Sequence, residues 1–194
     1  MTVAPPDDLR VALDDGDAAA ALDIVDALAP ELQPDLLAEV WMLAGSPRAL
    51  RTLLPRLSPE ARARAEDWLA APPTRPLPAA DDPDAYDTLA RHADELARKG
   101  RAADLVVTHL ALADAAPRAD WRVVHIEHAG SLALGLDDPD LNALVRAYEA
   151  QRDAELGEHD DAREAAITAL ASDEPRARAI ARRVLEALPP PLDE

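Results

Sequence analysis

The 194-residue sequence contains no cysteine and no phenylalanine. Without cysteine, the chain can form neither a disulfide nor a thiolate metal site. Aromatic residues are limited to three Trp and two Tyr, and the apolar 48% of the chain is built mainly from Ala and Leu. Because these are helix formers and strand-forming residues are scarce, the composition predicts an all-α fold with a substantial hydrophobic core.

The sequence also lacks a long apolar run and a basic leader. No stretch approaches the roughly 20 apolar residues of a membrane span. The first eight residues carry neither a basic nor an apolar segment for export. We therefore expect a cytoplasmic protein that does not engage membranes. Lys99 is the one lysine among 20 basic residues, and the heavy use of Arg, Ala and Asp points to a GC-rich bacterium as the source.

Positive charge is in short supply, because 38 acidic residues leave a net charge of −18. The acidic residues are spread along the chain. Such a surface repels nucleic acid and anionic lipid, and it indicates either a role of the charge in solubility or a partner with a basic segment. A decoy that mimics nucleic acid would need long unbroken rows of acidic residues, which this sequence does not contain.

Six of the eighteen prolines fall where a helix is expected to begin, since a first-turn residue needs no N–H. About five short helices are predicted in residues 1–71 and longer ones in residues 84–188, followed by a tail at 189–194. Residues 72–83 have the composition of an extended Pro-rich linker and mark the expected domain boundary. The alternative is a strap that lies against both halves of one continuous array and is anchored by Leu77.

Helix ends are marked by residues that satisfy free backbone groups. Asp17, Ser46, Ser58 and the Asp137–Asp138 pair are interpreted as caps. One predicted helix, residues 119–134, is apolar on more than one side. This pattern is typical of a helix sandwiched between neighbours, and so we expect it to be the core helix, separated from the next one at Gly135.

Three stretches share one layout, in which a glycine is followed by an Ala/Leu-rich helical segment and, 17 or 18 residues after the glycine, by a proline. They are residues 16–34, 100–117 and 157–175. In the last of them, the small residues Ala162 and Ala169 follow Gly157 at offsets of five and twelve.

These offsets resemble the second helix of the tetratricopeptide repeat, a family of antiparallel helix pairs of about 34 residues. The resemblance covers mainly residues 84–188, and the family's aromatic and Leu-Gly signature of the first helix is missing. It implies antiparallel helical hairpins stacked as a short α-solenoid, with a concave groove that binds a peptide or a partner's helix.

The leading functional hypothesis is a non-catalytic protein–protein interaction module, acting as adaptor, regulator or assembly subunit without a cofactor. The expected partner is a protein or peptide, and self-association is a further possibility. Tyr86, Trp121 and Tyr148 are the candidate partner-binding residues, since aromatic side chains are enriched at binding hot spots.

Histidines support an alternative hypothesis. His125 and His128 are three residues apart on one helical face, and His109 lies on the inward stripe of the preceding helix. Three imidazoles from adjacent helices could hold a metal ion and serve a metal-dependent helical-bundle enzyme. The competing interpretation is that His109 or His128 is an ordinary hydrogen-bonded core residue.

Overall fold

The structure, a computed structural model, describes residues 6–30, 32–73, 75 and 84–190. Its regular elements are helices, and these residues contain no strand, which confirms the all-α prediction. The N-terminal half contains α1 (Asp7–Asp14), α2 (Ala18–Asp26), α3 (Gln33–Ala44), α4 (Pro47–Leu53), a 3-10 turn (Leu54–Arg56) and α5 (Pro59–Ala70). The C-terminal half contains α6 (Ala85–Arg98), α7 (Ala102–Ala115), α8 (Ala119–Leu136), α9 (Pro139–Leu156), α10 (His159–Leu170) and α11 (Pro175–Ala187).

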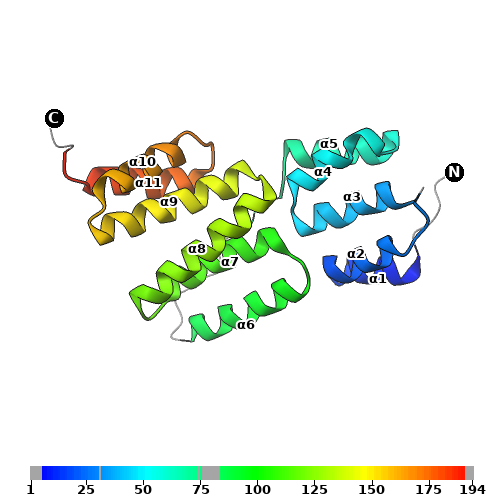
Figure 1. The fold of residues 1–194 in the computed structure, drawn as a ribbon, viewed down its shortest axis with the longest axis horizontal. Coiled ribbons are helices and arrows are strands. Elements are labelled where there is room, and N and C mark those ends of the chain that lie inside the picture. The colour runs from blue at the N-terminus through cyan, green and yellow to red at the C-terminus, as the bar shows by residue number, and fades with distance from the viewer. Residues whose placement is uncertain (1–5, 31, 74, 76–83, 191–194) are drawn as a thin grey trace.

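Helices that follow one another along the chain pack side by side as neighbouring pairs. The molecule is elongated as a result, with α1 to α5 at one end and α9 to α11 at the other (Figure 1). Within the part of the chain that is described, no helix is long and apolar enough to cross a membrane.

Four helices end in the same type of turn. The glycine after each helix has a φ between 65° and 83°, a conformation that costs an L side chain energy. The residue after each glycine donates its N–H to the carbonyl five positions back, as in a Schellman turn. The glycines are Gly16, Gly45, Gly100 and Gly157. Three of them begin the stretches identified in the sequence, and their expected place just past a helix is confirmed.

Predicted caps are confirmed at the helix starts. The side chains of Asp17, Ser46 and Ser58 accept hydrogen bonds from the backbone N–H groups three residues ahead, at 2.9, 3.4 and 3.3 Å. Asp138 is buried, and its carboxylate accepts two N–H groups at the start of α9. These side chains satisfy donors that a helix leaves free in its first turn.

The prediction that α8 is the core helix is wrong. Its buried residues form one stripe, whereas Val124 is 45% and Leu134 70% exposed. α7 and α9 are the central helices: most side chains of α7 are buried, and α9 buries eight of its residues and packs against α8, α10 and α11. An apolar residue on a second face of a helix is buried only when another helix packs against that face. α8 also continues through Gly135, and the turn falls at Asp137, which has a φ of 55°.

The two halves have separate apolar clusters, and polar contacts connect them. α1 to α5 build two small clusters, while the largest cluster joins α7 to α11. Between the halves, Arg51 pairs with Asp137 at 2.9 Å, and the Ala19 N–H donates to the Lys99 carbonyl at 3.1 Å.

Part of the expected linker is described. Arg75 pairs with Asp104 of α7 at 3.2 Å, and its carbonyl accepts a hydrogen bond from Arg176 of α11 at 2.6 Å. Arg75 thus contacts two helices of the C-terminal half. Residues 74 and 76–83, with the proposed anchor Leu77, and residues 191–194 of the expected tail lie outside the described residues.

Candidate functional site

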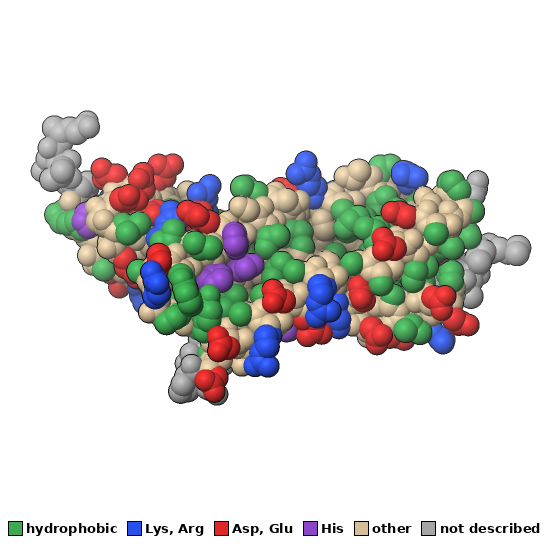
Figure 2. Space-filling view, turned by 60° about the horizontal axis from the view of Figure 1, so that its bottom comes forward, with side chains coloured by type: hydrophobic (Ala, Val, Ile, Leu, Met, Phe, Trp, Pro, Cys, Tyr) green, Lys and Arg blue, Asp and Glu red, His purple; other side chains and the backbone are tan. Residues whose placement is uncertain are grey.

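The three histidines of the sequence hypothesis lie together in the fold. α7 and α8 are neighbours in the packing, and this places His109 of α7 opposite His125 and His128 of α8. One nitrogen of each ring lies within 4.8 Å of the others. Figure 2 shows histidine side chains gathered on one face of the molecule and bordered by hydrophobic ones.

Contacts within this group are close. His109 Nδ1 and His125 Nδ1 are 3.2 Å apart, and the two rings stack with their centroids 5.4 Å apart. His128 meets His109 edge-on, with centroids at 5.3 Å. A hydrogen bond between two ring nitrogens requires one to carry the proton and the other to accept it. When both imidazoles are neutral, the Nδ1–H of one ring can therefore donate to the Nδ1 lone pair of the other.

Two of the predicted partner-binding residues belong to the same site. The Tyr86 hydroxyl of α6 lies 2.9 Å from His125 Nε2. The Tyr86 ring packs on Trp121 of α8 with centroids 5.3 Å apart, and the Arg118 guanidinium lies 5.8 Å from the Trp121 ring centre. We refer to the group as the histidine–aromatic cluster, which consists of Tyr86, His109, Trp121, His125 and His128.

The charge state of the cluster follows from its burial. Burial is the main cause that lowers the pKa of His109, and the charges of His125 and His128 lower it further, to about 4. Burial, followed by the charge of His128, also lowers the pKa of His125. Burial, followed by the charge of Asp87, raises the pKa of Tyr86. At neutral pH both imidazoles and the phenol are therefore neutral, and the imidazole nitrogens keep lone pairs for a ligand.

The cluster is open to solvent on one side. His128 is exposed, and Trp121 is 39% exposed, whereas His109 and His125 are half-buried. A small ligand could therefore reach the two inner rings past His128.

Tyr148 does not join this group. Its side chain is 2% exposed, and its hydroxyl donates to Asp114 at 2.6 Å. The expectation that Tyr148 lies on a binding surface therefore needs correction, because the residue is a packed core tyrosine of α9. Both tyrosines lie on the apolar stripe of their helices, and the sequence pattern does not show that Tyr148 is fully buried while Tyr86 is only partly buried.

A groove that the sequence did not indicate lies between α8, α9 and α10. It encloses about 730 Å³, and Leu134, Ala143 and Val145 are among its apolar wall residues. A second hollow adjoins it between α9 and α10, and the two share the lining residues Arg146, Glu149 and Thr168. That hollow is strongly acidic, since Asp153, Glu158, Asp161 and Glu164 line it as well. We call the two together the α8–α10 groove; it is apolar at one end and acidic at the other.

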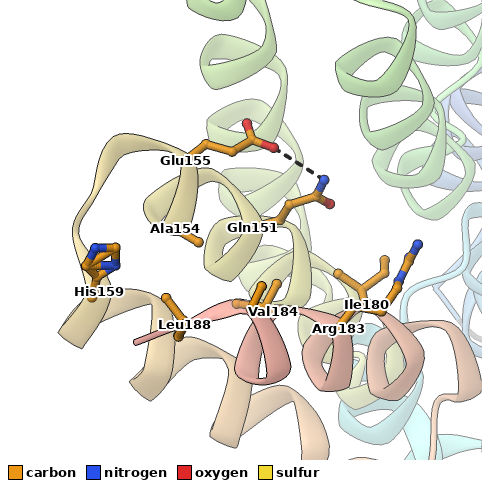
Figure 3. A pocket seen from close by; sticks show the side chains of 9 residues that line it. Gln151, Ala154, Glu155, His159, Ile180, Arg183, Val184 and Leu188 are labelled. Carbon is orange, nitrogen blue, oxygen red and sulfur yellow. Dashed lines mark hydrogen bonds between the residues drawn. The ribbon is translucent and has the colours of Figure 1, made fainter. Parts of the chain in front are cut away.

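A smaller cleft of about 360 Å³ lies between α9 and α11 near the start of α10 (Figure 3). Ile180, Val184 and Leu188 give it an apolar floor, and Gln151 donates a hydrogen bond to Glu155 on one side. Glu155 is already paired with Arg122 at 2.7 Å. None of the residues singled out in the sequence lines this cleft.

One signal in the sequence could have indicated the groove. Leu134 of α8, which lines the groove, lies off the buried stripe of its helix. Large apolar residues off the main stripe suggest either a second neighbour or an open surface, and only the fold decides between them.

No family model, curated protein or solved structure matches the chain.

Proposed function

We propose that this protein is a non-catalytic interaction module of the bacterial cytoplasm, whose helices stack as a tetratricopeptide-like array and bind a segment of another protein in the α8–α10 groove. The observation that carries the proposal is the groove itself, which has an apolar end with a 70%-exposed leucine, Leu134, beside an acidic end. Hydrophobic grooves between helices are common docking sites for amphipathic helices.

The apolar end supplies the driving force for binding. Leu134 leaves most of its side chain in water, and covering it gains about 25 cal/mol for each Å² of apolar surface removed from solvent. Ala143 and Val145 form the adjoining wall, where small residues allow a partner's backbone to approach closely.

The acidic end determines the chemistry of the partner. Glu158, Asp161 and Glu164 line it, against the basic residues Arg146 and Arg152. Arg146 is already paired with Glu149 at 2.8 Å, and Arg152 with Asp153 at 2.7 Å. The remaining carboxylates favour Lys or Arg on a bound segment. The partner is therefore expected to carry an amphipathic segment with apolar residues at one end and basic residues at the other.

The proposal is tested by capturing partners on the immobilised full-length protein, using extracts of the source bacterium. Leu134→Asp places a charge on the apolar wall and should abolish capture of the partner. Val11→Asp is the matched control, because Val11 is also an exposed apolar residue but lies on α1 at the other end of the molecule.

Salt gives a second readout. Binding should weaken as ionic strength rises, because the acidic end attracts the partner electrostatically. Equal capture by the wild type and Leu134→Asp would contradict the proposal. A stable dimer of the chain that Leu134→Asp dissociates would also contradict it, because the groove would then bind a second copy.

A further inference from the structure

We propose that His109, His125 and His128 bind one divalent first-row transition-metal ion, with Zn²⁺ as the representative case. This site is separate from the α8–α10 groove and does not depend on the proposed function. Three features support the site: the positions of the ring nitrogens, the contact with Tyr86 and the chemistry of an all-imidazole ligand set.

The nitrogens are close to the spacing that a metal needs. Zn–N bonds of about 2.0–2.1 Å in a tetrahedron place ligand nitrogens about 3.3 Å apart. His109 Nδ1 and His125 Nδ1 are 3.2 Å apart. The third nitrogen, from His128, completes a set within 4.8 Å. Because His128 is exposed, its ring can rotate toward the other two without disturbing the core.

Tyr86 orients the central ligand. Histidines that bind metals usually donate their second ring N–H to a fixed acceptor, which sets the tautomer and the angle of the ring. His125 Nε2 lies 2.9 Å from the Tyr86 hydroxyl, a distance at which Nε2–H can donate to the Tyr86 oxygen. When Nε2–H donates to the Tyr86 oxygen, His125 Nδ1 carries a lone pair and points toward His109. Tyr86 is thus a positioning residue for the metal site.

The proton between the two inner rings has to move when a metal ion binds, because His109 Nδ1 and His125 Nδ1 are 3.2 Å apart and only one of them can carry it. Neutral imidazole is the form that binds metal. On binding, the proton shared between the two Nδ1 atoms must leave Nδ1, and transfer to the other nitrogen of His109 keeps that ring neutral.

Ligand type determines the class of ion. Three imidazoles suit Zn²⁺, Cu²⁺, Ni²⁺ or Co²⁺, whereas Mg²⁺ and Ca²⁺ require oxygen ligands. A three-histidine set leaves a fourth coordination position, and the exposure of His128 places that position on the solvent side.

The test is a calorimetric titration of Zn²⁺ into the full-length protein after removal of metals with a chelator. We expect one ion per chain. His125→Ala and His128→Ala should each lower the affinity by about 100-fold, because a three-ligand site becomes a two-ligand site. His92→Ala and His159→Ala are the matched controls, since these exposed histidines are not part of the group, and both should leave the affinity unchanged.

Tyr86→Phe tests the positioning role. Loss of the hydroxyl should lower the Zn²⁺ affinity by about 10-fold, in line with other partners that orient metal-binding histidines. Substituting Co²⁺ adds a spectroscopic readout, because a four-coordinate site gives strong visible d–d bands. These bands should change in Tyr86→Phe, while the thermal unfolding of the chelator-treated variant should match that of the wild type.

The inference is overturned if the wild-type protein binds no stoichiometric Zn²⁺, or if His125→Ala and His128→Ala both bind it as tightly as the wild type. Exposed His128 makes its alanine variant the safer of the two for folding, and circular dichroism verifies this. Leu134→Asp should retain full Zn²⁺ affinity, so that loss of the metal site and loss of the partner groove can be distinguished.

Discussion

Tyr148 stabilises the core both by packing and by a hydrogen bond. Its ring is buried among α7, α9 and their neighbours, and its hydroxyl donates to Asp114 of α7 at 2.6 Å. A hydrogen bond of this kind, to a charged acceptor, contributes about 1.5–3 kcal/mol to stability. Burial, followed by the hydrogen bond and the charge of Asp114, raises the pKa of Tyr148 above its ordinary value of 10.0.

A dependence of stability on alkaline pH follows from this pKa. Above about pH 10 the unfolded chain releases the phenol proton while folded Tyr148 retains it, so the free energy of unfolding falls as pH rises. Denaturant titrations at several values between pH 9 and pH 11 should show this fall. In Tyr148→Phe the fall should be smaller, although the variant is less stable at neutral pH. An equal fall in both proteins would show that Tyr148 does not contribute.

The histidine–aromatic cluster was only partly predictable at this scale. The three-residue spacing of His125 and His128 fixes their shared face, since it reflects helix geometry alone. The place of Tyr86 could not be derived in this way, because its contact with His125 spans 39 residues and depends on how α6 packs against α8. Tyr148 was misplaced for the same reason.

At the scale of helices, the turns are the most strictly determined features. Gly45 has a φ of 75°, and a Cβ there would run into Ala103 and the Arg75 guanidinium. Gly135 lies inside α8, and a Cβ at that position would meet nothing within 4 Å. The two glycines therefore offer a direct comparison of the same substitution in two backbone conformations.

Gly45→Ala should lower the free energy of unfolding by about 2 kcal/mol, because the left-handed conformation and the close contact both penalise a side chain. Gly135→Ala should raise it by about 0.5–1 kcal/mol, since alanine favours the helix and has room. Thermal and urea denaturation of the two variants provide the measurement. Equal effects, or a more stable Gly45→Ala, would contradict the account.

Helix ends were predictable from the sequence and helix faces less so. A glycine that ends a helix, or a Ser, Asp or Pro that begins one, acts on the backbone next to it. The ends of the helices can therefore be predicted from residues within one or two turns. The outer face of α8 depends on whether a distant helix covers it. Val124 and Leu134 therefore indicated a buried face in the sequence, although both side chains are exposed.

At the scale of the whole molecule, stability is unevenly distributed. The largest apolar cluster joins α7 to α11, and the smaller clusters of α1 to α5 are separate from it, with polar contacts such as Arg51–Asp137 between the halves. Exposed ion pairs of this kind contribute little to the free energy of unfolding. The all-α class was predictable from composition, but this division of the core depends on long-range packing.

Hydrogen exchange measured by mass spectrometry should reveal this division. Amides of α7 and α9 are expected to exchange slowest, and amides of α1 to α5 faster, because local opening of the N-terminal half exposes less apolar surface. Moderate salt should speed exchange in α1 and α2 more than in α9. Uniform protection across all helices would show that the two halves form a single cooperative unit.

The central claim is that a partner docks in the α8–α10 groove, and site-specific photo-crosslinking tests it most directly. A photoreactive amino acid replaces Leu134 or, as the control, Val11, and the protein is irradiated in cells of the organism that produces it. We expect one discrete adduct from position 134, with a protein whose crosslinked segment is amphipathic and basic, and none from position 11. Equal adducts from both positions, or an adduct from position 11 alone, would contradict it.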